Sequence, residues 1–284
     1  MNLYPRLWRL AEEAEPPQRY RGLIKVDYDQ FRDKVSGGDL EFAGYLVSSL
    51  YSGKAWLLKG AFSPGWMTDL KANTYAWTRS RPESFHKMID GAPDFHRMID
   101  IETGKKYSLE GCKHSAYFFR WNHDPLGIWP AITDRWRVLK MAMGLMADEY
   151  EHNLPSDGPV DRIQVVRYPP SIGFLEPHQD PATNQRCFIS GYMSRRGVDY
   201  SSGGFYFVGD NNEIIDAEPD IDVGDLCIGY ATVMHGVAPC DRGKAVDWAS
   251  DDGRWFLGLY SNSPDGGKRD TTKPVKLGIA EVLP

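Results

Sequence analysis

The stretch FLEPHQDPATNQ, residues 174–185, places a histidine and an aspartate two positions apart between two prolines. On an extended chain, side chains two positions apart point to the same side, so His178 and Asp180 can reach a common ligand. The alternative is a pair of polar residues in an exposed turn. Short motifs also occur by chance, so the meaning of this one depends on the rest of the sequence.

Composition and charge exclude several classes of protein. The chain has 284 residues, of which 42% are hydrophobic and 25% charged, as in a globular protein that can bury a core. Its net charge is −6 and it has no long basic run, so we expect no nucleic-acid partner. No apolar stretch approaches the roughly 20 residues of a membrane helix, and no signal peptide opens the chain. We therefore expect a cytoplasmic protein with no membrane partner.

Most of the cysteines and histidines belong to no motif. The four cysteines show no CxxC spacing, so we expect reduced, mostly buried thiols. Five histidines have no partner at a ligand spacing and are expected at the surface: His86, His96, His114, His123 and His152. His178 and His235 remain as the candidates for metal chemistry.

The first half of the chain is predicted to be mainly helical. Residues 27–51 have the pattern of two short helices separated at a Gly-Gly pair, and the apolar run 55–62 is typical of a strand. Ser63 followed by Pro64 is typical of a helix start, which predicts a helix near residues 64–74.

An apolar stripe follows Pro130. Large side chains recur every three or four residues, which places them on one face of a helix: Trp129, Ile132, Trp136, Leu139, Met143, Met146 and Tyr150. Such a helix packs on the outside of a sheet or forms a subunit interface. An oligomer through residues 129–150 therefore stays open.

From residue 161 the hydrophobic period shortens to two. In DRIQVVRYPP, Gln164 and Tyr168 fall on one face of an extended chain and Arg167 on the other. Four further strand candidates are separated by turns rich in glycine and aspartate: 186–194, 203–209, 225–237 and 254–262. Short strands between such close turns predict a sandwich or jelly roll and leave no room for the crossover helices of a parallel sheet.

His235 ends one predicted strand and Arg254 begins the next. Two imidazoles and one carboxylate can bind one face of an octahedral iron(II) and leave three positions open. His178, Asp180 and His235 are thus candidate ligands, although no sequence spacing fixes the third. A keto acid at the open positions would need a cation for its far carboxylate, and a guanidinium such as that of Arg254 can make a bidentate contact there.

Residues 162–262 resemble the iron(II)/2-oxoglutarate-dependent dioxygenase superfamily, and its prolyl-4-hydroxylase-like catalytic domain in particular. The text that carries the resemblance is, in order, IQVVRYPPSIGFLEPHQD, GGFYF, DVGDLCIGY, HGVAP and RWFLGLYSNS. The resemblance implies that His178, Asp180 and His235 bind iron and that Arg254 holds the far carboxylate of 2-oxoglutarate. It also matches Tyr168 to a tyrosine that contacts 2-oxoglutarate, although a core aromatic is the alternative.

Two departures from the family pattern matter. Positions 235 and 254 are 19 apart, a longer gap than usual, so CDRGKAVDWASDDG would be an inserted loop and Arg242 becomes a rival for the anchor. The anchor is also more often lysine in the prolyl-hydroxylase group, which favours another branch and a small-molecule substrate. Because halogenating relatives carry a small residue where Asp180 stands, oxygenation, desaturation or ring formation is favoured over chlorination.

Candidate substrate contacts are less defined. Tyr117, Phe119 and Trp121 would share one face of a strand, as a cavity wall or as core. Arg195 and Arg196 lie in a loop that could pair with an anionic substrate group near the site. The alternative for these two arginines is a solvated surface.

We therefore expect an α+β protein with a mainly β core, in one domain of residues 1–284. A double-stranded β-helix (jelly roll) over 155–284 would carry the catalytic site, flanked by a largely helical portion over 1–154. The expected function is an iron(II)- and 2-oxoglutarate-dependent oxygenase that uses O2 to oxidise an unactivated C–H bond of a small molecule. Hydroxylation is the first expectation, with desaturation or cyclisation as variants and a natural-product or amino-acid-derived intermediate as substrate. Ascorbate is expected to help in vitro.

Two other classes stay open at this point. A jelly roll with a His/Asp/His site also suits a cupin-like metalloenzyme without a keto acid, or a non-catalytic binding module. Arg254 discriminates among them, because only the keto-acid reaction needs a buried cation one strand after the last ligand.

Overall fold

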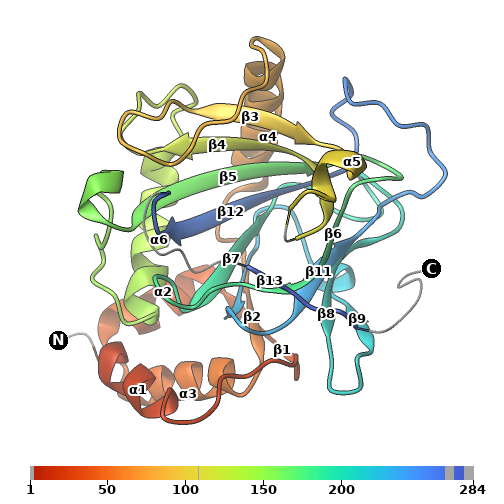
Figure 1. The fold of residues 1–284 in the computed structure, drawn as a ribbon. Coiled ribbons are helices and arrows are strands. Elements are labelled where there is room, and N and C mark those ends of the chain that lie inside the picture. The colour runs from red at the N-terminus through yellow and green to blue at the C-terminus, as the bar shows by residue number, and fades with distance from the viewer. Residues whose placement is uncertain (1–2, 108, 266–271, 278–284) are drawn as a thin grey trace.

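The computed structural model describes residues 3–107, 109–265 and 272–277. Its strands are β1 (Leu23–Asp27), β2 (Ala55–Lys59), β3 (Phe95–Ile99), β4 (Gly111–Phe119), β5 (Val160–Tyr168), β6 (Phe174–Gln179), β7 (Cys187–Tyr192), β8 (Gly204–Val208), β9 (Ile214–Asp216), β10 (Leu226–Tyr230), β11 (His235–Ala238), β12 (Arg254–Asn262) and β13 (Lys273–Pro274). Together they form one curled sheet (Figure 1).

Neighbouring strands of this sheet are mostly distant in sequence. Their order is β1-β2-β10-β7-β12-β5-β4-β6-β11-β8-β9, with β3 beside β4 and β13 beside β6. β1 and β2 run parallel, whereas the pairs that surround the site run antiparallel. In Figure 1, β3, β4, β5 and β12 form an upper layer, and β6, β11, β8 and β9 lie below it, in the right half of the view. The predicted absence of a parallel α/β sheet agrees with this arrangement.

The strands predicted in the second half are present. β5, β7, β8 and β12 lie within or next to the expected ranges, and 225–237 divides into β10 and β11 because the chain turns at 231–234. The motif at 178–180 lies at the end of a strand of its own. A turn at 169–173 separates β5 from the strand β6, so His178 belongs to β6 and Asp180 follows its end.

The helices are α1 (Tyr4–Ala11), α2 (Tyr28–Gly37), α3 (Leu40–Tyr51), α4 (Pro64–Arg79), α5 (Ile101–Gly104) and α6 (Trp129–Ala142). The two predicted helices of 27–51 are confirmed as α2 and α3, with Gly38 in the left-handed conformation (φ 70°) between them. Ser63 caps α4 by accepting a hydrogen bond from the backbone N–H of Trp66 at 3.2 Å, and the helix runs to Arg79, beyond the expected end.

The predicted helix of 129–150 is too long. α6 ends at Ala142, because Met143 and Gly144 (φ 79°) turn the chain out of the helix. Trp136 and the other early members of the stripe are buried, but Met146 is 65% exposed, so the stripe does not continue over the full range. A subunit interface through this helix stays a prediction.

The portion 1–154 is less helical than predicted. It supplies β1 to β4, and β2 pairs with β10 while β4 pairs with β5 and β6. These strands were missed where they are short, as in β1 and β3, because a run of five residues gives too few alternations to recognise. Strands of both portions therefore share one sheet.

The cysteines and histidines follow the predictions only in part. All four cysteines are buried and free, as expected. His96 is buried, which corrects its expected surface position, and its Nδ1 lies 2.9 Å from Nε2 of His114. The ring of Trp77 packs edge-on against His96 with the centroids 6.0 Å apart, and this cover excludes water. Among the described residues, no helix is long and apolar enough to cross a bilayer.

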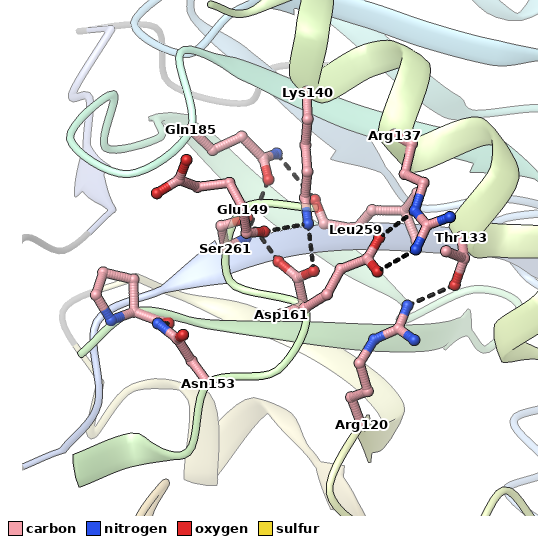
Figure 2. Close-up of polar contacts among 12 residues, drawn as sticks. Arg120, Thr133, Arg137, Lys140, Glu149, Asn153, Asp161, Gln185, Leu259 and Ser261 are labelled. Atoms are coloured by element: carbon pink, nitrogen blue, oxygen red, sulfur yellow. Dashed lines mark hydrogen bonds and ion pairs between the residues drawn. The ribbon is translucent and has the colours of Figure 1, made fainter. Parts of the chain in front are cut away.

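A buried polar network ties α6 to the sheet (Figure 2). Lys140 of α6 donates to Asp161 of β5 at 2.5 Å, and both side chains are 1% exposed. Asp161 also accepts from the Ser261 hydroxyl of β12 at 2.9 Å. The backbone N–H of Ser261 in turn donates to Gln185 at 3.0 Å, whose amide donates to the Leu259 carbonyl at 2.9 Å. Helix, two central strands and the segment before β7 are thereby fixed to one another.

We predict that Lys140→Met lowers the free energy of unfolding by about 3–5 kcal/mol, because it leaves the Asp161 carboxylate buried without its counter-ion. Urea denaturation of both proteins measures the difference. Lys105→Met is the control, since Lys105 pairs with Glu102 at an exposed position and should cost less than about 1 kcal/mol. A Lys140 variant that is as stable as the control would contradict the prediction.

Candidate active site

The pairing of β6 with β11 assembles the three predicted ligand residues. His178 lies directly opposite His235 in this antiparallel pair, and their ring centroids are 4.4 Å apart. Asp180 follows the end of β6, where its backbone N–H donates to the Ala231 carbonyl at 2.9 Å. One ligand atom from each of His178, Asp180 and His235 lies within 4.8 Å of the others. The structure therefore brings together the side chains that the sequence singled out.

Backbone carbonyls fix which nitrogen of each imidazole faces the centre. Nδ1 of His178 lies 2.8 Å from the Glu176 carbonyl, and Nδ1 of His235 lies 2.9 Å from the Val233 carbonyl. A carbonyl only accepts, so each Nδ1 carries a hydrogen, and in the neutral form of such an imidazole Nε2 has the free lone pair. The Nε2 atoms of His178 and His235 point to the same carboxylate, at 3.9 and 3.8 Å from oxygens of Asp180. This is the state in which imidazoles bind metal ions.

Burial keeps His178 neutral. It lowers the pKa of His178 to about 4, and the neighbouring His235 acts in the same direction while Asp180 opposes the shift. Asp180 is held by the Thr272 hydroxyl, which donates to it at 3.1 Å. Two neutral imidazoles and a carboxylate are the donor set that iron(II) accepts in a facial arrangement, so the residues present fit that metal.

A narrow chamber of about 30 Å³ continues inward from the three ligand residues and is also lined by Tyr168, Phe256 and Arg254. The register of β5 with β12 places Tyr168 directly opposite Arg254. Arg254 is 2% exposed, and its guanidinium carbon lies 5.6 to 6.0 Å from the ring centroids of Tyr192, Phe205 and Phe256. The predicted anchor therefore lies in the same space as the candidate metal ligands.

The carboxylate of Glu218 fixes the guanidinium of Arg254 through its Nε. This carboxylate accepts from Nε of Arg254 at 2.7 Å, and also from the Tyr200 hydroxyl and the Phe205 backbone N–H, each at 2.6 Å. Gly204 leaves the space for this carboxylate, because a Cβ there would lie 2.4 Å from Oε1. The charge of Arg254 is thus fixed in place by a buried acid.

Other donors of the chamber have no partner among the described residues. Within that part of the chain, no residue accepts a hydrogen bond from the terminal nitrogens of Arg254, and the buried Tyr168 hydroxyl also has none. Buried donors of this kind cost free energy unless a ligand satisfies them. A carboxylate between Arg254 and Tyr168 would satisfy both, so the chamber fits one end of a keto acid.

A larger cavity of about 380 Å³ adjoins the chamber. Five residues line both spaces: Leu175, His178, Asp180, Phe188 and Tyr260. Beyond them the cavity carries three cations, Arg97, Lys113 and Arg162, together with the tyrosines Tyr107 and Tyr117. Ser261 and Gln185 of the buried network also line it. The candidate metal centre therefore lies between a small anion-accepting chamber and a space for a second molecule.

Solved structures share this fold, although no family model and no curated protein matches the sequence. One is a C-terminal truncated protein of Neurospora crassa in apo form, here called the Neurospora protein. It gives a TM-score of 0.52 at 14% identity, over 84% of this chain and 94% of that chain. The full-length Neurospora protein in complex with alpha-KG and 5-formyluracil gives 0.51 at 15% identity, over 85% and 84%. Its complex with alpha-KG and thymine gives 0.50 at 15% identity, over 88% of each chain.

The chain has the fold of the Neurospora protein. The expected fold class, an α+β protein with a double-stranded β-helix core and flanking helices, is confirmed by this match and by the curled sheet.

Within the fold shared with the Neurospora protein, Arg242 and Arg254, the two candidate anchors for the keto acid, have different surroundings. Arg242 is exposed and lines neither cavity, whereas Arg254 lines the chamber. Residues 239–253 contain no helix or strand, and they include the expected loop CDRGKAVDWASDDG. Arg167 holds this loop by donating to the carbonyls of Asp247, Trp248 and Asp252 at 2.7 to 3.1 Å.

Most of the predicted substrate contacts line neither the chamber nor the larger cavity. Arg195 and Arg196 line neither cavity and pair instead with Asp222 and Asp216, at 3.1 and 2.6 Å. Phe119 and Trp121 stack on each other in a small core cluster beside Phe95. Tyr117 is both part of this cluster and a lining residue of the larger cavity, so wall and core are both present.

Sequence reasoning missed the cations of the larger cavity. Arg162 shares the alternating face of Gln164 and Tyr168 on β5, and Lys113 shares that of Tyr117 on β4. Extending the alternation by one or two steps would have found both. Glu218 had no such signal, because it lies in a short turn far from Arg254 in the sequence.

We predict that the metal-free protein loses stability as the pH falls from about 6.5 toward 4. The folded chain keeps His178 and His114 neutral, since burial lowers the pKa of each to about 4. The unfolded chain takes up both protons first, so each histidine reduces the free energy of unfolding by up to about 1.4 kcal/mol per pH unit in this window. Above the unfolded pKa both states are neutral and the effect is absent.

Urea denaturation in the presence of a chelator, between about pH 5 and 7, measures this slope. His114→Gln should reduce the slope by one proton's contribution, and His152→Gln, at an exposed position, serves as the control. An equal slope in the His114 variant and the wild type would show that the buried imidazole does not resist protonation.

Proposed function

We propose that the protein is an iron(II)- and 2-oxoglutarate-dependent oxygenase that acts on a small molecule. The observation that carries the proposal is the convergence of His178, Asp180 and His235 within 4.8 Å, beside a chamber where Arg254 and Tyr168 have donors without partners among the described residues. His178, Asp180 and His235 would hold the iron. Arg254 would pair with the far carboxylate of 2-oxoglutarate, and the Tyr168 hydroxyl would donate to it.

When bound, iron and 2-oxoglutarate would supply the activation of O2, coupled to oxidative loss of carbon dioxide from the keto acid. The chain's residues orient the reaction. Arg254, fixed by Glu218, sets the direction of the keto acid along the chamber. The rings of Phe188 and Phe205 pack at 4.6 and 5.7 Å from the His235 ring and exclude water from one side of the centre.

The reaction outcome follows from the ligand set. Asp180 would occupy the position at the metal that a halide needs, so oxygenation of a substrate C–H bond is favoured over its chlorination, with hydroxylation as the simplest result. A small-molecule substrate is supported by the cavity of about 380 Å³. The Neurospora protein, which shares the fold, has been solved with thymine and with 5-formyluracil. We further expect the enzyme to act in the cytoplasm.

The cupin-like and non-catalytic alternatives do not account for the chamber. Neither requires a guanidinium that is 2% exposed and fixed by a buried carboxylate, with its terminal nitrogens directed to no acceptor in the described part of the chain. Glu218 compensates the charge, but the terminal nitrogens of Arg254 and the buried Tyr168 hydroxyl still lack acceptors among the described residues, and a ligand carboxylate would supply them. The keto-acid function is therefore the better account of Arg254.

The first test is spectroscopic and needs no substrate. Without oxygen, the protein with iron(II) and 2-oxoglutarate should develop a metal-to-ligand charge-transfer band, and His235→Ala should abolish it. With oxygen, succinate should form slowly even without substrate, with ascorbate sustaining turnover. If the wild type gave neither the band nor succinate, the proposed function would be contradicted.

Arg254→Lys should raise the concentration of 2-oxoglutarate needed for half of the band by about ten- to a hundred-fold, because lysine keeps the charge opposite Glu218 but cannot make a bidentate contact. Arg242→Lys is the matched control and should leave the titration unchanged, since Arg242 is exposed and lines neither cavity. An Arg254 variant that titrates like the control would assign the anchor to another residue.

A further inference from the structure

The larger cavity has a charge opposite to that of the chain as a whole. The protein has a net charge of −6, yet Arg97, Lys113 and Arg162 line this cavity. Among the described residues that line it, Asp180 is the one carboxylate, and the proposed metal would engage that group. The lining therefore carries three cations against a single acid that already has a role.

The strand register places these cations on one wall. Lys113 is opposite Ile99 in the β3–β4 pair, and Arg97 is opposite Ser115, two positions further along β4. Arg162 is opposite Tyr260 in the β5–β12 pair. Side chains at alternate positions of neighbouring strands share a face, so the sheet itself directs the three cations into the same space.

Arg162 is held rigidly between two rings. Its guanidinium carbon lies 5.3 Å from the ring centroids of both Tyr117 and Tyr260. Arg97 contacts the Tyr107 hydroxyl and lies over the Phe85 ring at 4.7 Å. Arg162 also donates to Oε1 of Gln164 at 3.4 Å. A guanidinium carries five N–H donors, and arginine recognises carboxylates and phosphates through them.

Lys113 is the group for which the protein supplies no counter-charge. It has no ion pair and no hydrogen bond from its ammonium within the described part of the chain, although it is partly buried in the cavity. Burial, together with Arg162 and Arg97, lowers the pKa of Lys113 to about 8, while Asp180 opposes the shift. A positive charge kept at this position without a partner in the described chain is stabilised when an anion enters.

We infer that the substrate of the proposed oxygenase is a small organic anion whose carboxylate or phosphate group binds Lys113 and Arg162. Arg97 lies on the same wall and adds to the attraction. This inference rests on the proposed function in calling the bound anion a substrate. The anion site itself is argued only from the residues that line the larger cavity. The cations are distinct from Arg254, which lines the inner chamber and would already be engaged by 2-oxoglutarate.

The test uses three probes of one shape: benzoate, phenyl phosphate and the neutral benzamide. Each is titrated by calorimetry into the full chain under anaerobic conditions, with iron(II) and saturating 2-oxoglutarate, so that Arg254 is occupied. At least one anion should bind about ten-fold or more tightly than benzamide. The tighter of the two anions distinguishes a carboxylate from a phosphate substrate.

Variants then locate the binding. Lys113→Met and Arg162→Gln should each weaken binding of the preferred anion by about ten-fold or more, while the charge-transfer band with 2-oxoglutarate persists and shows that the site is intact. Lys87→Met removes the same charge from an exposed residue outside the cavity and should change nothing.

Three outcomes overturn the inference: benzamide binding as tightly as the anions, no anion binding to the wild type, or unchanged binding in Lys113→Met. Repeating the titration on the metal-free protein separates the two proposals. Anion binding to the metal-free protein, together with no charge-transfer band when iron(II) and 2-oxoglutarate are added to the wild type, would remove the oxygenase and keep the anion site. A band with iron(II) and 2-oxoglutarate but no anion binding would do the reverse.

Discussion

The antiparallel pairing of β6 with β11 is the constraint on which the site depends. It sets His178 opposite His235, and each Nδ1 faces a backbone carbonyl, that of Glu176 in β6 and that of Val233 in the turn before β11. The Nε2 atoms of His178 and His235 therefore point toward the same carboxylate, that of Asp180, in the absence of a metal ion. Asp180 completes the set because its backbone is bonded to the turn that precedes β11. A slip of one residue in this pair would turn one imidazole to the other face of the sheet and separate the donors.

Three cations of this chain, two buried and one partly buried, differ in what compensates them. Lys140 pairs with Asp161, whereas Arg254 pairs with Glu218 through Nε, and its terminal nitrogens have no acceptor among the described residues. Lys113 has no partner among the described residues. The three cations therefore differ in how far an acid of the chain neutralises them. Composition alone would count them as equal positive charges.

The sequence alone was sufficient to single out His178, Asp180, His235 and Arg254, which the fold brings to one cavity, but not to predict their surroundings. His178 and Asp180 were found because two positions along an extended chain share a side, and Arg254 because the following strand was clear. Glu218 was not found, since its contact with Arg254 arises from packing between distant segments. The end of α6 was misplaced because an apolar period continues past Ala142, and the left-handed Gly144 overrides it.

The loop 239–253 is held in an uncommon way. Arg167, on the face of β5 turned away from the site, binds three main-chain oxygens of the loop and none of its side chains. Contacts to the main chain are indifferent to residue type, so the loop can change its amino acids over evolution while its path over the sheet stays the same. Substitutions in that segment could therefore alter the exposed surface there, while the strands β11 and β12 on either side of it keep their places.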